Sequence, residues 1–143
     1  MLNHPETEET FRYLTDADWQ LLMEKARKTE FARGEMVVEE GETSRNIFLI
    51  ARGGVRLERQ RSGRTDVLAQ LGPGQVFGEV AFADRTGAGA SVIAEEPTEM
   101  EMIIGEDVDA LLQSVPGFAT RFYMSLAATL ARRLRATAER ALR

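Results

Sequence analysis

The sequence has no cysteine and a single histidine, His4, and it contains no apolar run long enough to cross a bilayer. The absence of cysteine excludes disulfides, thiolate metal sites and cysteine nucleophiles, and it fits a reducing compartment, so we expect a cytoplasmic protein without a membrane segment. His4 lies in a polar N-terminal stretch, and no acid pair or nucleophile arrangement emerges from the spacing of the other residues. We therefore expect no catalytic residue, no metal site and no resident cofactor.

Positive charge is also in deficit, with 18 Lys and Arg residues against 23 Asp and Glu residues and a net charge of −5. Bulk affinity for nucleic acid depends on a basic surface, so this balance argues against it. A chain of 143 residues, 43% of them hydrophobic, is long enough to bury a core as one domain. Residues 1–10 are acidic, unlike a signal peptide, and have little apolar content, so we expect a loose lead-in there and one domain over residues 11–143.

Short β-strand patterns separated by glycine turns fill the middle of the chain. Val55, Leu57 and Arg59 occupy alternate positions of one such pattern, and a Ser-Gly turn at residues 62–63 separates it from the next. Many short strands at regular spacing predict an antiparallel β-roll or jelly roll over about residues 28–105.

Helical patterns flank this region. Trp19 and Leu22 recur at helical spacing near the N-terminus, and C-terminal helices are predicted over residues 106–143, the last of them starting at Phe118. An apolar stripe with a spacing of four residues follows this long helix through Phe122, Leu126, Leu130, Leu134 and Ala138. The stripe fits either packing on the chain's own β-roll or contact with a second copy in a dimer. The fold class is therefore mainly β with flanking helices.

The most distinctive stretch of the sequence is a glycine-rich loop over residues 72–92. A Gly-Pro-Gly turn leads into Phe77-Gly78-Glu79, then into one short helical turn and a run of small side chains that ends at Ser91. Small residues let backbone amides approach a ligand closely, and amides at the start of a short helix suit an anion. The residue types fit a binding loop and an ordinary connection between strands about equally.

The setting of this loop resembles the cyclic nucleotide-binding domain family, and the resemblance covers the chain from Phe11 onward. The family's phosphate-binding cassette has the form Phe-Gly-Glu, a short helix, an arginine, small residues and then Ser or Thr. The matching segment here, residues 77–91, is called the cassette below. The resemblance implies a β-roll with an N-terminal helix, a short cassette helix and a long C-terminal helix.

The resemblance also implies roles for particular residues. Glu79 would accept a ribose hydroxyl, the amides of Gly78 and Ala90 would hold the phosphate, and Ser91 would donate a hydroxyl. Thr137 matches one of two hydroxyl residues that contact the base from the long helix. The candidate ligand-binding residues are Phe77, Gly78, Glu79, Val80, Ala88, Gly89, Ala90, Ser91 and Thr137.

One departure from the family pattern concerns the cassette arginine that pairs with the cyclic phosphate. The positions nine and ten residues after Glu79 are Ala88 and Gly89, so that charge is missing. A hydrogen bond to a charged group contributes roughly 1.5–3 kcal/mol, so phosphate affinity should fall roughly ten- to a hundred-fold. Arg85 is the nearby cation in sequence, although its position also fits a solvated loop charge.

These features predict a non-catalytic sensor domain that binds cyclic AMP or cyclic GMP weakly and passes the signal through the long helix, as a homodimer. Two alternatives remain. The first is a dimerisation or docking module that has lost nucleotide binding, and the second is a pocket for a less anionic ligand. No helix-turn-helix follows the long helix in this sequence, so we expect no DNA-binding element in these residues.

Overall fold

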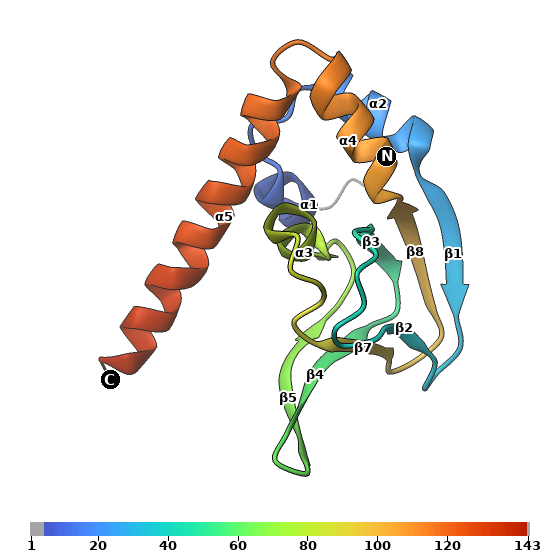
Figure 1. The fold of residues 1–143 in the computed structure, drawn as a ribbon, viewed down its shortest axis with the longest axis vertical. Helices are drawn as coiled ribbons and strands as arrows, with labels where there is room; N and C mark the ends of the chain where they lie inside the picture. The colour runs from blue at the N-terminus through green and yellow to red at the C-terminus, as the bar shows by residue number, and fades with distance from the viewer. Residues whose placement is uncertain (1–4, 143) are drawn as a thin grey trace.

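The computed structural model describes residues 5–142, and its strands form two four-stranded antiparallel sheets (Figure 1). The strand order is β1-β8-β3-β6 in one sheet and β2-β7-β4-β5 in the other. The strands are β1 (Arg27–Phe31), β2 (Met36–Val38), β3 (Ile47–Arg52), β4 (Val55–Arg61), β5 (Arg64–Leu71), β6 (Val76–Phe77), β7 (Ser91–Ala94) and β8 (Thr98–Ile103). The helices are α1 (Pro5–Thr10), α2 (Asp16–Lys25), α3 (Glu79–Asp84), α4 (Gly105–Ser114) and α5 (Phe118–Ala141). Arg143, the last residue of the predicted long helix, lies outside the described residues.

Strand β3 is buried on both faces and separates two apolar cores. Its alternate residues Ile47 and Leu49 belong to a core shared with the helices, whereas Phe48 and Ile50 belong to a core inside the β-roll. This division follows from the strand period of two, because successive side chains point to opposite faces. An unbroken apolar run is therefore the expected sequence for this strand.

The hairpin between β4 and β5 turns at the predicted Ser-Gly pair. Ser62 has φ 50° and Gly63 has φ 80°, so both central residues adopt the left-handed conformation. A two-residue turn of this kind matches the twist of the strands on either side. The antiparallel pairing continues from Arg61 opposite Arg64 back to Val55 opposite Leu71.

Helix α5 packs on the domain through its first half. Phe122 is fully buried, and its ring centroid lies 5.9 Å from that of Phe11, 5.7 Å from that of Phe82 and 5.9 Å from that of Phe118. The C-terminal end of α5 extends away from the strands (Figure 1). The first half of the apolar stripe thus packs internally, while Leu130 and Leu134 are 45% and 71% exposed.

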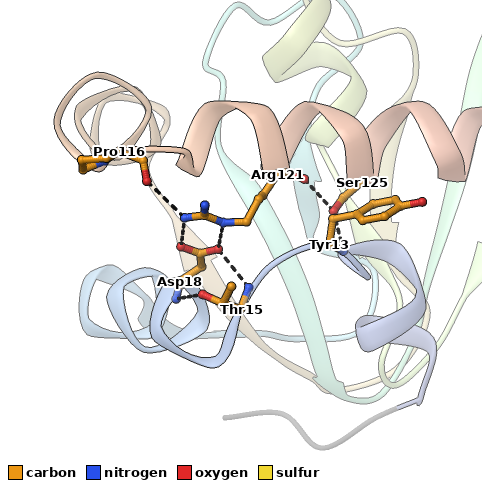
Figure 2. A network of polar contacts seen from close by, with 6 residues as sticks. All are labelled: Tyr13, Thr15, Asp18, Pro116, Arg121 and Ser125. Atoms are coloured by element: carbon orange, nitrogen blue, oxygen red, sulfur yellow. Dashed lines mark hydrogen bonds and ion pairs between the residues drawn. The ribbon is translucent and has the colours of Figure 1, made fainter.

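A buried ion pair fastens α2 to the start of α5. Asp18 accepts hydrogen bonds from Arg121 Nε at 2.6 Å and from Arg121 Nη2 at 2.8 Å, and its side chain is only 2% exposed. Figure 2 shows that the same carboxylate accepts a hydrogen bond from the Thr15 amide. The Thr15 hydroxyl in turn accepts a hydrogen bond from the Asp18 amide, so the two residues cap the start of α2. Arg121 is the main reason that the pKa of Asp18 is lowered.

The predicted loose lead-in is wrong where the structure describes it, because residues Pro5–Thr10 form α1. Thr7 is buried, and its hydroxyl donates to the carbonyl of Gly74. The Thr129 hydroxyl of α5 also donates to the carbonyl of Thr10 at 3.0 Å. These polar contacts to distant parts of the chain fix α1. The pattern of apolar residues in the sequence cannot predict them, because they form only in the folded chain. Residues 1–4 of the predicted lead-in, including His4, lie outside the described residues.

Candidate functional site

A cavity of about 530 Å³ lies between the cassette and the β-roll. Most of the predicted site residues line it, namely Phe77, Gly78, Glu79, Val80, Ala88, Gly89 and Ala90. The wall opposite the cassette comes largely from apolar side chains of β2 to β5, and two arginines, Arg59 and Arg133, add positive charge. The predicted binding loop therefore encloses a space large enough for a small molecule.

Gly78 is required by the backbone at the entrance to α3. Its φ is 92°, and a Cβ atom at this position would lie 2.3 Å from the carbonyl oxygen of Asn46. A side chain would thus both strain the backbone and collide with β-roll main chain. This close approach explains how the Phe-Gly-Glu sequence delivers Glu79 to the cavity.

Glu79 is a buried carboxylate with an incomplete set of partners. The residue is 3% exposed, and its Oε1 lies 3.3 Å from Nη1 of Arg133 on α5. Its Oε2 is buried without a hydrogen-bond partner in the described residues. Burial raises the pKa of the Glu79 carboxyl, and its own backbone amide and Arg133 oppose the increase only in part. A buried oxygen without a partner is suited to accept a hydrogen bond from a hydroxyl group of a ligand.

Helix α3 is held in place by an arginine outside the cassette. Arg45 donates from Nε and Nη2 to the carbonyl oxygen of Phe82 at 3.0 and 2.9 Å, and from Nη1 to Asp109 of α4 at 2.8 Å. Its guanidinium carbon also lies 4.2 Å from the centroid of the Phe82 ring. Sequence reasoning missed this residue, because only the fold brings it to α3.

The small residues after α3 are fastened to the turn between β2 and β3. The Ala88 amide donates to the Glu42 carbonyl at 2.9 Å, and the Gly41 amide donates to the Ala88 carbonyl at 2.8 Å. The Ser91 hydroxyl accepts the Glu40 amide at 2.9 Å, and Ser91 is not among the residues lining the cavity. In this structure Ser91 therefore supports the loop instead of facing the cavity.

Distance along the sequence does not indicate which arginine, Arg85 or Arg59, lies at the cavity. Arg85 points toward α4, with its Nη2 3.7 Å from Asp109, and it does not line the cavity. Arg59 of β4 lines the cavity, and its Nε donates to the carbonyl oxygen of Gly89 at 3.0 Å. The signal for Arg59 was its position in the alternating series with Val55 and Leu57, which places it on the inner face of β4.

Thr137 is not brought to the cavity in this structure. It is exposed on the distal half of α5, where its hydroxyl donates to the Arg133 carbonyl oxygen at 3.0 Å. A second cavity of about 430 Å³ lies nearer the start of this helix, between α3 and α5, and Glu79 and Val80 line both cavities. Its other lining residues are Ala83, Asp84, Tyr123, Leu126, Ala127, Thr129 and Leu130.

Two further features of residues 5–142 bear on the function class. This part of the chain contains no group of three or more His, Cys, Asp or Glu side chains placed to hold a metal ion. None of the helices within it has the length and apolar character needed to cross a bilayer.

Comparison with known proteins finds relatives for most of the chain. The sequence profile of the cyclic nucleotide-binding domain matches residues 28–115. Cyclic AMP receptor protein of Thermus thermophilus is 35% identical over 126 residues, which cover 87% of this chain and 56% of that protein. Cyclic GMP-binding protein C of Dictyostelium discoideum is 31% identical over 126 residues, which cover 82% of this chain and 5% of that protein. The chain thus spans little more than half of the first relative and a small part of the second.

The fold agrees with these sequence relationships. The crystal structure of the Thermus thermophilus catabolite activator protein aligns with a TM-score of 0.77 and 34% identity, covering 94% of this chain and 62% of that one. This likeness confirms the predicted fold class of an antiparallel β-roll with flanking helices. The profile match takes in more than half of the chain, including the whole cassette. The chain therefore belongs to the cyclic nucleotide-binding domain family.

Proposed function

We propose that this chain is a non-catalytic sensor domain that binds a cyclic nucleotide in the cavity beside the cassette. The observation that carries the proposal is the Glu79 carboxylate, which is buried at the cavity wall and has one oxygen without a hydrogen-bond partner among residues 5–142. A ribose hydroxyl would satisfy that oxygen, and the small residues Ala88, Gly89 and Ala90 leave room for the phosphate. One relative is named for cyclic AMP and another for cyclic GMP, so the relatives support a cyclic nucleotide without choosing between the two.

The affinity of this site is expected to be modest because the cassette arginine is absent. Ala88 and Gly89 line the cavity where that residue would stand, and neither has a charge. The loss of one charged hydrogen bond lowers affinity by roughly ten- to a hundred-fold. A less anionic ligand is the alternative occupant of the same cavity.

Ligand binding is proposed to reach α5 through two contacts with α3. The Glu79 carboxylate pairs with Arg133, and the Phe82 ring meets Phe122 edge to face at 5.7 Å. A ligand hydroxyl on Oε2 would weaken the Arg133 pair at Oε1 and so favour a different position of α5, provided that the ligand binds the two positions with different affinity. The domain is proposed to act in the cytoplasm, with no DNA-binding element in these residues.

Calorimetric titration with cyclic AMP and with cyclic GMP tests the binding proposal. We expect a dissociation constant in the micromolar to submillimolar range for at least one of them. Glu79→Gln should weaken that binding by about tenfold or more, because an amide is a poorer hydrogen-bond acceptor than a carboxylate. Glu106→Gln, an exposed change of the same kind on α4, should leave the affinity unchanged. Absence of heat from both nucleotides up to millimolar concentration would contradict the proposal.

A dimerisation module is the second candidate function, and the distal half of α5 favours it. Leu130 and Leu134 are exposed large apolar side chains on this half of the helix. Two such helices could pair along their stripes as a homodimer. This candidate does not exclude the first, because the stripe and the cassette cavity use different residues.

A further inference from the structure

The missing cassette arginine leaves a space that a residue from another element faces. Ala88 and Gly89 are the positions where a phosphate-binding arginine is absent, and Arg59 of β4 approaches that point from across the cavity. Its Nε donates to the Gly89 carbonyl oxygen at 3.0 Å, and a Cβ atom added to Gly89 would lie 3.6 Å from Arg59 Nη2. The guanidinium of Arg59 therefore lies directly beside residue 89.

Strand β4 holds Arg59 firmly in this position. The strand pairs with β5 on one side, where Arg59 stands opposite Asp66, and with β7 on the other, where Glu58 stands opposite Ser91. Leu57 and Arg59 line the cavity whereas Glu58 does not, as the strand period requires. The backbone of Arg59 is thus fixed by its pairing with β5, while the pairing of β4 with β7 ends one residue earlier, at Glu58.

The guanidinium of Arg59 forms no ion pair within the described residues, unlike the arginines around it. The cavity's other arginine, Arg133, pairs with Glu79 at 3.3 Å, and the neighbouring arginines of β4, Arg56 and Arg61, pair with Glu58 and Asp66. No ion pair of residues 5–142 includes Arg59. Its Nε is engaged by the Gly89 carbonyl, which orients the guanidinium and leaves the Nη1 and Nη2 edge for another acceptor.

We propose that Arg59 replaces the missing cassette arginine and binds the phosphate of the ligand. This inference rests on the proposed cyclic nucleotide binding and assigns its phosphate subsite. A guanidinium presents parallel N–H donors that match two phosphate oxygens, and it keeps its charge at every physiological pH. The cation would thus come from the β-roll wall opposite the cassette, while Glu79 accepts a hydrogen bond from the ribose hydroxyl on the cassette side.

The test compares Arg59→Gln with a matched control by calorimetric titration of the whole chain with cyclic AMP, cyclic GMP and adenosine. Arg61→Gln is the control, because Arg61 loses the same charge from the same strand but does not line the cavity. We expect Arg59→Gln to weaken cyclic nucleotide binding by about ten- to a hundred-fold, to leave adenosine binding unchanged, and to unfold at the wild-type temperature. Arg61→Gln should bind like the wild type.

A second variant distinguishes a lost phosphate contact from a general defect. Ala88→Arg added to Arg59→Gln returns a cation to the family's own position and should recover at least part of the lost affinity. The inference is overturned if Arg59→Gln binds the cyclic nucleotide as the wild type does, or if adenosine binding falls equally. If the wild type binds neither cyclic nucleotide, the proposed function itself is contradicted. That outcome differs from normal binding by Arg59→Gln, which contradicts only the role of Arg59.

Discussion

Single residues at the cassette combine a cost in stability with a role in binding, and Glu79 shows this most clearly. Its buried carboxylate has a raised pKa in the folded protein, so the folded state holds that proton more tightly than the unfolded chain does. The contribution of Glu79 to stability therefore falls as pH rises from about 4.3, the ordinary value of the unfolded residue, to the higher folded value. Above that window the whole penalty of the buried charge is present.

Glu79→Gln should consequently stabilise the ligand-free protein at neutral pH while it weakens ligand binding. We expect a gain of about 1–2 kcal/mol in the free energy of unfolding, since the amide has no charge to bury. Urea denaturation at pH 7 and at pH 4 measures it, and the gain should be smaller at the lower pH, where Glu79 is already protonated. An equal gain at both values would show that charge burial is not its cause.

Gly78 permits a second test at the scale of one residue. Gly78→Ala should cost about 3 kcal/mol or more, because the added Cβ meets the Asn46 carbonyl and the backbone has a φ of 92°. Gly63→Ala is the matched control, with a φ of 80° but no atom of the described residues within 4 Å of the added Cβ. It should cost only the conformational strain, about 1–2 kcal/mol. Equal losses in urea denaturation would refute the role assigned to the close approach.

At the scale of elements, the ion pair between Asp18 and Arg121 attaches α2 to the start of α5. Asp18→Asn leaves Arg121 without its carboxylate, and we expect a loss of about 2 kcal/mol, reduced from the value for a fully buried pair because the Arg121 side chain is 29% exposed. The exposed Asp16→Asn on the same helix should cost less than about 0.5 kcal/mol. Thermal unfolding at pH 7 measures both losses.

The same pair predicts a pH dependence of opposite sign to that of Glu79. The pKa of Asp18 is lowered in the folded protein, so its stabilisation is present above the unfolded value of about 3.9 and is lost as pH falls through the lower folded value. The difference in unfolding free energy between the wild type and Asp18→Asn should thus shrink as the solution is acidified below pH 4. A difference that stays constant down to pH 2 would contradict the assignment.

The distal half of α5 carries the prediction about assembly. Leu134→Arg should weaken a homodimer formed along the stripe by tenfold or more, because a charged side chain replaces an apolar one at the contact. Leu134 is 71% exposed, so the monomer should keep its unfolding temperature. Val67→Arg, on β5 and 56% exposed, is the control that changes charge elsewhere. Sedimentation velocity measures the monomer–dimer equilibrium of each variant. A wild type that remains monomeric at all concentrations would contradict the proposed homodimer.

For the whole molecule, the sequence predicted the elements with strong periodicity and missed contacts that only the fold creates. The Ser-Gly turn at residues 62–63 has a local signal, and the small residues of the cassette predicted the binding loop that lines the cavity. The alternation along β4 indicates that Arg59 shares a face with Val55 and Leu57. Its contact with Gly89 depends on the tertiary structure and has no signal in the local sequence. Helix α1 was missed because polar contacts through Thr7 and Thr10 hold it, and Thr137 was placed near the cavity by resemblance alone.

The proposed coupling between the ligand and α5 passes through Glu79, because this residue lines the cavity and also pairs with Arg133 of α5. A ligand hydroxyl that donates to Oε2 draws charge from the carboxylate and weakens its pair with Arg133, which lies 3.3 Å from Oε1, so binding should loosen the distal half of α5 while it orders the cassette. Amide hydrogen exchange, measured with and without saturating cyclic nucleotide, should therefore become faster over residues 130–141 and slower over residues 77–91. Arg133→Gln already lacks the pair, so its distal helix should exchange quickly without ligand and change little when ligand binds. A distal helix that responds equally in this variant would show that the signal travels instead through the packing of Phe82 on Phe122.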